Sequence, residues 1–386
     1  MPMQPRDSVV RGFVVSALAL TMALALSSCC CRKLLSLKKS SSSSPTSSSS
    51  SKECQPTDFT QCSTYCSDGV MQACYRVGVA HDYGKYGAAH DQSLAATYYQ
   101  RACDGGYPLG CNDLGVLYSK GAGVEKDLAR AAVLYTKACD AGEQWGCANL
   151  GRHYLYGWGV AKNESKGISL LNQACMSNNY FGCGALGSAY ATGRGVAKDE
   201  VQATTYFRKG CDGKDGNSCN HLGWHYATGE GGLARDDTQG ITLFKKSCDL
   251  GNAMGCVNEG EMWDGGRGQY KDRSKAVEHY TLGCNQNEML GCNLLAGMLE
   301  YGEGTVKDAA RADQLYRKSC TASLVERYKT GCLDSDDPAD DDCAAYGACL
   351  YKGYGVTANR AAAADPLRKG CKWGISAACT RLPSAR

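Results

Sequence analysis

The chain has 386 residues, 25 cysteines and a net charge of +3 at pH 7. The charges form no basic stripe and there are only six histidines, which argues against a nucleic-acid-binding protein and a histidine-rich metalloenzyme. So many regularly paired cysteines indicate a disulfide framework that forms outside the reducing cytosol.

The first 28 residues have the features of an export signal. Arg6 and Arg11 precede an apolar run over residues 12–26, which is too short to span a membrane comfortably. The run ends in Leu-Ser-Ser-Cys, which resembles the bacterial lipobox, and this resemblance implies that Cys29 is lipidated and begins the mature protein. The alternative is an ordinary secretory cleavage nearby, which leaves Cys29, Cys30 and Cys31 as stray thiols. We expect an exported lipoprotein that faces the periplasm or the exterior, with the outer membrane favoured.

Residues 29–51 form the next predicted segment, a flexible tether. Residues 40–51 are serine except for Pro45 and Thr46, and such a sequence cannot bury enough apolar surface to fold. Residues 52–65 follow as an expected N-terminal cap, which a Cys54–Cys62 disulfide would close. We therefore expect a folded body that contacts the membrane only through its lipid anchor.

From residue 66 onward, cysteines recur in pairs that are eight residues apart. The first members of successive inner pairs are 36 or 37 residues apart, a period typical of solenoids built from small helical units. The predicted disulfides are Cys66–Cys74, Cys103–Cys111, Cys139–Cys147, Cys175–Cys183, Cys211–Cys219, Cys248–Cys256, Cys284–Cys292 and Cys371–Cys379.

The residues around each pair predict two helices per unit. Leucine and an aromatic residue follow the second cysteine by three and seven positions, as Leu114 and Tyr118 follow Cys111, which places them on one helix face. The glycine between them, such as Gly115, permits close approach of a neighbouring helix. A Gly-x-Gly breaker then ends the first helix, and an Asp or Asn starts the second, as at Asp127, Asn163, Asp199 and Asp308.

The phrase Leu-Gly-x-x-Tyr-x-x-Gly-x-Gly-Val resembles the Sel-one-like repeat, a relative of the tetratricopeptide repeat. With cysteine at two usually small positions, residues 63–382 are similar to the Helicobacter cysteine-rich protein family. The resemblance implies an all-α, right-handed α/α superhelical solenoid of about eight repeats over residues 66–386, with a disulfide in each repeat. It also implies either penicillin binding and β-lactamase activity or the partner-assembling role of many Sel-one-like proteins.

The repeat pattern is interrupted by an acidic insertion over residues 321–342, which brings two additional cysteines. We expect a solvated loop held by Cys320–Cys343 and Cys332–Cys349, because runs of like charge are usually exposed. A calcium site is the alternative, although the spacing lacks the glycine and terminal glutamate of a recognised calcium loop.

Motifs for catalysis or metal binding are weak. A Ser-x-x-Lys sequence begins at Ser36 beside the tether, and Lys329-Thr330-Gly331 lies in the insertion, so neither has the context of a β-lactamase motif. His221 and His225 share a helix face, but no third metal ligand is evident. We predict no metal and no cofactor.

An exposed surface is the best remaining candidate for function. The chain has 23 tyrosines and five phenylalanines, and hydroxylated aromatics suit positions that meet both water and a partner. The candidate ligand-binding residues are Tyr156, Trp158, Trp224, His225 and Tyr301.

The leading hypothesis is a monomeric scaffold that binds a peptide or protein along its concave face. The first alternative is a penicillin-binding or β-lactamase-like hydrolase, with β-lactams or cell-wall fragments as ligands. The second is a passive spacer between membrane and wall.

Overall fold

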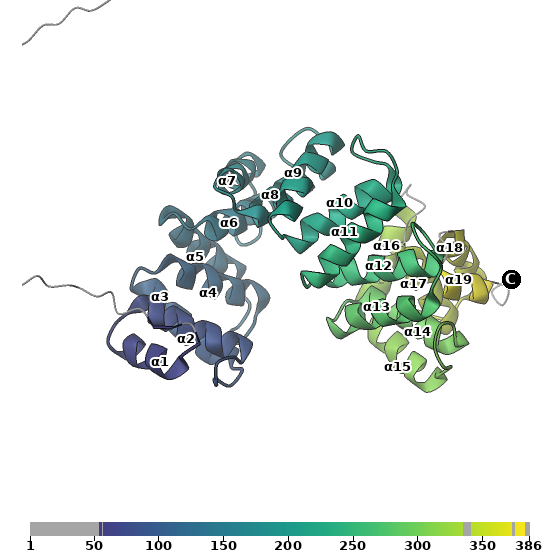
Figure 1. The fold of residues 1–386 in the computed structure, drawn as a ribbon, viewed down its shortest axis with the longest axis horizontal. Coiled ribbons are helices and arrows are strands. Elements are labelled where there is room, and N and C mark those ends of the chain that lie inside the picture. The colour runs from purple at the N-terminus through teal and green to yellow at the C-terminus, as the bar shows by residue number, and fades with distance from the viewer. Residues whose placement is uncertain (1–53, 56, 335–340, 373–374, 383–386) are drawn as a thin grey trace, which may run out of the picture. The chain divides into compact units, whose positions relative to one another are not determined.

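The computed structural model describes residues 54–55, 57–334, 341–372 and 375–382, all within one compact unit, Ser51–Arg386. The predicted signal peptide, the tether and Cys29, Cys30 and Cys31 lie outside the described residues. The described part contains α-helices and no strand, and Figure 1 shows the helices following one another in a stack. The helices are α1 (Phe59–Ser67), α2 (Met71–Tyr83), α3 (Gln92–Asp104), α4 (Pro108–Lys120), α5 (Leu128–Asp140), α6 (Gln144–Tyr156), α7 (Glu164–Met176), α8 (Tyr180–Thr192), α9 (Glu200–Asp212), α10 (Gly216–Thr228), α11 (Asp237–Asp249), α12 (Ala253–Gly265), α13 (Arg273–Asn285), α14 (Met289–Tyr301), α15 (Ala309–Ser319), α16 (Ala322–Asp334), α17 (Asp341–Lys352), α18 (Arg360–Lys372) and α19 (Ser376–Arg381).

Helix boundaries follow the predicted signals. The side chain of Asp127 accepts a hydrogen bond from the backbone N–H of Arg130 and so caps α5. Asn163, Asp199 and Asp308 cap α7, α9 and α15 in the same way. First helices end at a glycine in the left-handed conformation, as α4 does at Gly121 with φ 74°. The predicted unit of helix, glycine loop and helix is confirmed.

The spacing of glycine and aromatic residues, which recurs from repeat to repeat, explains how the two helices of a unit pack so closely. A Cβ atom added to Gly115 would lie 2.7 Å from the Tyr135 ring, and one added to Gly187 would lie 2.7 Å from Phe207. Both rings are buried. Each glycine therefore provides the space into which the aromatic ring of the following helix packs.

Eleven disulfides join the 22 described cysteines. In eight of the pairs that are eight residues apart, one cysteine lies near the end of a helix and the other in the first turns of the next, with Cα atoms 4.5 to 4.6 Å apart. The ninth pair joins Cys54, which precedes α1, to Cys62 within α1, with Cα atoms 5.1 Å apart. Closing so short a loop lowers the entropy of the unfolded chain and stabilises the fold by about 2 to 3 kcal/mol per bridge. These are Cys54–Cys62, Cys66–Cys74, Cys103–Cys111, Cys139–Cys147, Cys175–Cys183, Cys211–Cys219, Cys248–Cys256, Cys284–Cys292 and Cys371–Cys379.

The prediction for the insertion is wrong in two respects. The structure pairs Cys332 with Cys343 and Cys320 with Cys349, instead of Cys320–Cys343 and Cys332–Cys349. The cause is α16, a helix where we expected a solvated loop, although residues 335–340 lie outside the described part. Because α16 ends beside the start of α17, Cys332 and Cys343 form the usual bridge between consecutive helices, and Cys320 and Cys349 remain as partners.

First helices of successive repeats also pack against one another, as α6 does with α8 and α8 with α10, whereas second helices contact one another less. We call the side of the stack on which the first helices contact one another its inner face. We call α2, α4, α6, α8, α10, α12, α14 and α17 the first-helix row. No helix in the described part of the chain is both long and apolar enough to cross a bilayer.

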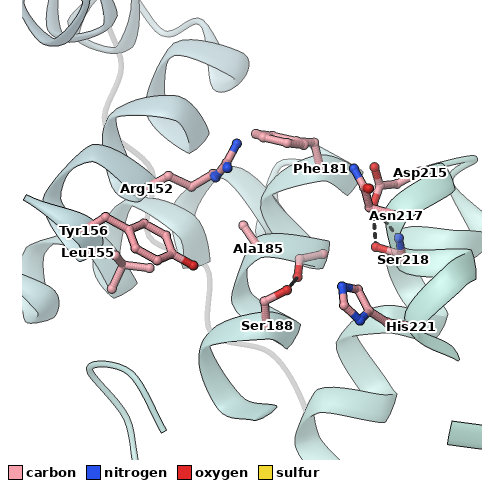
Figure 2. A pocket seen from close by; sticks show the side chains of 11 residues that line it. Arg152, Leu155, Tyr156, Phe181, Ala185, Ser188, Asp215, Asn217, Ser218 and His221 are labelled. Carbon is pink, nitrogen blue, oxygen red and sulfur yellow. Dashed lines mark hydrogen bonds between the residues drawn. The ribbon is translucent and has the colours of Figure 1, made fainter. Parts of the chain in front are cut away.

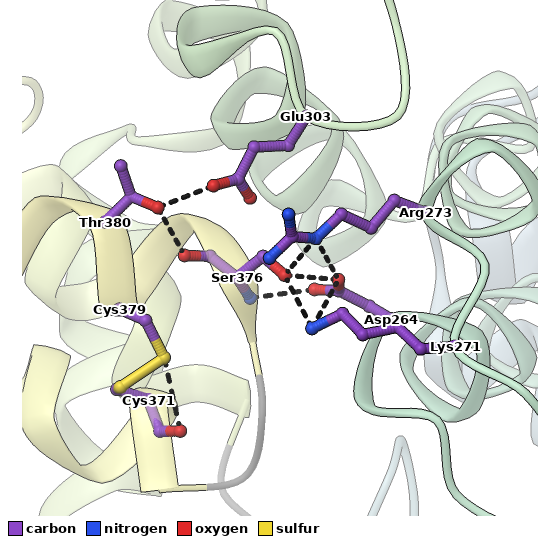
Figure 3. The surroundings of a disulfide bond; sticks show 8 residues. All are labelled: Asp264, Lys271, Arg273, Glu303, Cys371, Ser376, Cys379 and Thr380. Atoms are coloured by element: carbon purple, nitrogen blue, oxygen red, sulfur yellow. Dashed lines mark hydrogen bonds and ion pairs between the residues drawn. A yellow bond between two sulfur atoms is a disulfide. The ribbon is translucent and has the colours of Figure 1, made fainter.

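The C-terminal helix α19 returns to this row. It packs against α14 as well as α17 and α18, and Ser376 reaches Asp264 on α12 (Figure 3). The backbone N–H of Ser376 donates to Asp264 Oδ2 at 2.8 Å, and its hydroxyl donates to Oδ1 at 2.5 Å. Arg273 Nε donates to the same hydroxyl at 2.9 Å. The inner faces of α12 and α14 are thus covered by the chain's own last helix.

Arg381 holds the other end of α19 although its side chain is almost fully buried. Its guanidinium donates to the carboxylate of Glu300 and to the hydroxyl of Tyr316, and its Nε lies 3.2 Å from the Tyr301 hydroxyl. Burial opposes ionisation of Glu300, but Arg381 and Lys352 outweigh that effect, and the pKa of Glu300 is lowered. The buried charge is therefore paired and hydrogen-bonded.

Candidate binding surface on the first-helix row

The open part of the first-helix row contains a hollow between α6, α8 and α10 (Figure 2). It is a cavity of about 220 Å³, smaller than the cleft that a drug-sized ligand usually occupies. Its lining combines apolar and polar groups: Arg152, Leu155 and Tyr156 from α6; Phe181, Gly184, Ala185 and Ser188 from α8; and Asp215, Asn217, Ser218 and His221 at and within α10.

Two arginines lie beside aromatic rings at this hollow. The guanidinium carbon of Arg152 is 5.3 Å from the centre of the Phe181 ring and 5.4 Å from that of Trp158. Arg194 lies 4.4 Å from the centre of the Tyr156 ring. Neither arginine forms a hydrogen bond or an ion pair with any residue that the structure describes. The aromatic rings stabilise both cations without neutralising them.

The acidic group of the hollow, in contrast, is already engaged. Asp215 caps α10 and accepts hydrogen bonds from the backbone N–H of Ser218 at 2.9 Å and from its hydroxyl at 2.5 Å. Ser218 is fully buried, and the Ser188 hydroxyl donates to the carbonyl of Gly184 at 3.2 Å. The carboxylate of Asp215 is therefore held by Ser218, and Arg152 is the charged group of this lining without a hydrogen-bonding partner in the described part of the chain.

A second hollow of about 450 Å³ continues the surface towards α2. Arg152, Phe181 and Trp145 border it together with side chains of α2 and α4, and Arg152 and Phe181 border both hollows. Trp145 stacks on Phe181 with ring centres 5.7 Å apart and remains 49% exposed. Large aromatic surface left in contact with water is typical of a site that meets a partner.

The predicted ligand-binding residues lie in different parts of the structure and do not form one site. Tyr156 lines the hollow at 39% exposure, and Trp158 stacks on it with ring centres 4.5 Å apart. Trp224 is half-buried and meets Phe244 of α11 edge-on. Tyr301 is in contact with Arg381 and so lies where α19 covers the row.

His225, one of the candidate ligand-binding residues, is not on the surface, so this prediction is wrong, and His153 at the same repeat position is not on the surface either. Both side chains are buried, because the sixth position after the second cysteine faces the preceding second helix. His225 Nδ1 lies 2.6 Å from the hydroxyl of Thr204 on α9, and His153 Nδ1 lies 2.6 Å from the carbonyl of Trp158. Burial lowers the pKa of both histidines, which are therefore neutral at pH 7.

His221 reaches solvent in the hollow, although it shares a helix with His225. Its ring stacks on Phe207 with centres 4.6 Å apart. The pKa of His221 is lowered, first because surrounding protein groups displace water from the imidazole and second because His225 is close. His221 therefore offers a neutral imidazole at pH 7. It adds hydrogen-bonding capacity to the hollow without adding charge.

One group of possible metal ligands occurs in the described part of the chain, at Cys248, Glu259 and His279. Cys248 is in a disulfide with Cys256 and therefore offers no thiolate. Burial raises the pKa of Glu259 to about 7, and its Oε2 lies 3.4 Å from Nδ1 of His279. This pair is a feature of the core and lies away from the two hollows.

The sequence analysis missed the side chains that define the open surface: Trp145, Arg152, Phe181 and Asn217. A signal for them was present. They lie two residues before or five residues after the second cysteine, and these offsets belong to one helix face. The repeat pattern used for the prediction, at offsets three, four and seven, lies on the buried face, and the open face lies beside it.

These observations define an all-α repeat solenoid with a disulfide-stapled unit of two helices. The Sel1 repeat model matches residues 72–107, 108–143, 146–179, 182–215, 216–252, 257–288, 290–324 and 341–365. Since these segments cover well over half of the chain, the protein belongs to the Sel1 repeat family and is a Sel1-repeat scaffold. Its many disulfides indicate an oxidising compartment outside the cytosol.

The chain is similar to several solved structures. A Sel1 repeat protein from Oxalobacter formigenes is 21% identical with a TM-score of 0.50, over 64% of this chain and 96% of that chain. A protective antigen of uropathogenic Escherichia coli is 23% identical with a TM-score of 0.48, over 85% and 82%. Helicobacter pylori cysteine-rich protein B is 34% identical with a TM-score of 0.28, over 35% and 97%. No curated protein sequence matches the chain.

Proposed function

We propose that this protein is an exported, lipid-anchored scaffold whose first-helix row, from α4 to α10, binds a peptide or protein partner in the cell envelope. The observation that carries the proposal is the pair of adjoining hollows, which expose Trp145 and Tyr156 and leave the charge of Arg152 unpaired. Exposed aromatics and an arginine are the residue types that dominate binding energy at protein interfaces.

The rigidity of the scaffold supports this function. Each repeat beside the first hollow is closed by a disulfide and by the packing of a large side chain onto a glycine, an aromatic ring at Gly187 and Gly223 and Leu171 at Gly151. The hollows are therefore formed before a ligand arrives. A preformed surface loses little conformational entropy on binding.

A photocrosslinking experiment tests the proposal. A photoreactive amino acid at Ala185, which lines the hollow, is compared with the same amino acid at Val201, which is exposed on the second helix α9. In cell-envelope extract, we expect a discrete crosslinked species from Ala185 and none from Val201. Equal labelling at both positions would show that the inner surface has no special role.

The lipid anchor is part of the proposal and has its own test. The lipobox resemblance at Cys29 and the serine-rich tether support a protein held at a distance from the membrane. Replacing Cys29 with serine is expected to move the protein from the membrane fraction to the soluble fraction. Unchanged fractionation of Cys29→Ser would refute lipidation and leave the binding surface untouched.

A further inference from the structure

We infer that the hollow between α6, α8 and α10 binds the C-terminal carboxylate of a partner polypeptide that ends in an apolar residue. The inference rests on the proposed function and names the chemistry of the bound segment. Arg152 would hold the carboxylate, and Leu155, Ala185 and Phe181 would contact the last side chain.

Charge is the first argument. Arg152 projects into the hollow without a hydrogen-bonding or ion-pairing partner in the described part of the chain, while the only carboxylate in the lining, Asp215, is occupied by Ser218. Arg194, which contacts the Tyr156 ring, lies outside the lining, and its charge also acts on Glu164. An arginine that lines a hollow without a hydrogen-bonding partner in the described residues favours an anionic ligand, and its planar fork matches a carboxylate.

The mixed lining is the second argument. Beside the guanidinium are apolar groups of Leu155, Ala185 and Phe181, and on the other side are the amide of Asn217 and the neutral imidazole of His221. A C-terminal residue presents a carboxylate and a side chain from a single Cα atom, so it satisfies both parts of a hollow of about 220 Å³. The carboxylate of an Asp or Glu side chain would place no apolar group beside it.

The continuation of the surface is the third argument. The second hollow, which shares Arg152 and Phe181 with the first, extends the surface towards α4 and α2. In the other direction, α19 covers the row at α12 and α14. The open stretch of the row therefore ends beyond the first hollow. A chain that enters along the second hollow can place its terminus in the first, where the guanidinium of Arg152 selects the C-terminus.

The probe for this inference is a library of random heptapeptides displayed with free C-termini on a carrier protein. The selected peptide is then synthesised in three forms: the free acid, the C-terminal amide, and an amide whose last residue is Glu. Binding to the purified, oxidised protein is measured by calorimetry. We expect the acid to bind at least about tenfold more tightly than either amide. The simple amide lacks the charge-assisted hydrogen bond to arginine, and the Glu-terminated amide lacks an apolar side chain on the Cα atom that carries its carboxylate.

Variants assign the effect to one residue. Arg152→Gln is expected to weaken binding of the acid about tenfold or more and to leave binding of the amide unchanged, and Arg152→Lys should lie between Gln and the wild type. Arg311→Gln, on an exposed arginine of α15, is the matched control and should change nothing. Thermal melting under non-reducing conditions verifies that each variant is folded.

Several results would overturn the inference. The first is that the wild type binds the free acid and the amide with equal affinity. The second is that it binds the free acid and the Glu-terminated amide with equal affinity. The third is that Arg152→Gln binds the free acid as tightly as the wild type does. If these occur while Ala185 still crosslinks selectively, the inner surface binds a partner by another chemistry and only the carboxylate inference fails. If Ala185 labels no more than Val201 as well, the proposed function fails with it.

Discussion

The first-helix row is covered at one end and open at the other, and the two ends differ at equivalent repeat positions. Five residues after the second cysteine, α14 carries Gly297, whereas α6 carries Arg152. A Cβ atom at Gly297 would lie 2.4 Å from Cβ of Ala377, so the glycine is what lets α19 lie against the row. At the open end the same position carries a long cation that projects into a hollow.

The comparison shows how one scaffold offers two kinds of inner surface. At the covered end, the carboxylates of Asp264 and Glu300, both eight residues after the second cysteine, receive the serine and arginine of α19. At the open end that position carries Leu155 and Ala191, and the charged group without a hydrogen-bonding partner in the described residues is Arg152. A ligand for the open end must therefore supply acceptors where α19 supplies donors.

Removing Arg381 should produce the largest effect on stability. Arg381→Met removes the buried partner of Glu300, which keeps only the less buried Lys352, and breaking a buried pair costs up to about 3 to 5 kcal/mol. We expect a lower free energy of unfolding in urea and rapid amide exchange in α19. The exposed Arg311→Met serves as control, and the double variant Glu300→Gln/Arg381→Met should recover part of the loss. Wild-type stability in Arg381→Met would mean that α19 is not held as described.

A buried carboxyl at the covered end should make stability depend on pH. Glu259 occupies the repeat position that carries Leu114, Leu150, Leu186 and Leu222 at the open end, and its folded pKa is raised from 4.5 to about 7. Between these values the folded chain retains a proton that the unfolded chain releases. Stability therefore falls as the pH rises from 4.5 to 7, by about 3 kcal/mol at most.

The variant Glu259→Gln isolates this contribution, because the neighbouring His279, Lys245 and Asp249 are the same in both proteins. From pH 5 to pH 8, the wild type should lose stability relative to Glu259→Gln in urea unfolding, whereas the exposed Asp212→Asn should keep a constant difference. Glu259→Leu, which restores the residue of the open-end repeats, should be the more stable protein at pH 8. A pH-independent gap between wild type and Glu259→Gln would contradict the raised pKa.

A single methyl group should loosen the covering helix. Gly297→Ala forces its Cβ against Ala377, and overpacking of this kind costs about 1 to 3 kcal/mol. Hydrogen exchange in residues 376–382 should accelerate, and Ala377→Gly in the same chain should slow it again by removing the clashing atom. Ser188→Ala, at the same repeat position of the open end, provides the comparison and should leave exchange unchanged.

The smallest effect on stability is expected at Arg152. Because its charge is unpaired, Arg152→Gln should shift the free energy of unfolding by no more than about 0.5 kcal/mol, as for an ordinary surface change. A loss as large as that of Arg381→Met would show that Arg152 is a structural residue and would remove the contrast between the two ends.

Local regularities of the sequence were sufficient to predict the repeat. The cysteine spacing, the capping Asp and Asn residues and the glycine opposite each aromatic all act within about 40 residues, and each reports one local contact. The disulfide pairing of the insertion was not predicted correctly, because α16 forms where the acidic composition predicted a loop. This helix changes which cysteines lie close together.

Features that depend on curvature could not be predicted from spacing. Asp264 and Ser376 are 112 positions apart, and nothing local to either residue indicates that they meet. For the same reason Tyr301 was predicted to be open although α19 lies over it. The prediction for His225 was wrong for a local reason. Adjacent residues of a helix face different directions, and His225 faces α9 instead of the hollow.

Oxidative footprinting of the inner surface, with and without the partner captured at Ala185, tests the central claim most directly. We predict that Trp145 and Tyr156 are labelled in the free protein and protected in the complex, while the buried Tyr316 beneath α19 stays protected in both. Unchanged labelling of Trp145 and Tyr156 in the complex, or strong labelling of Tyr316 in the free protein, would contradict a scaffold that is covered at one end and binds at the other.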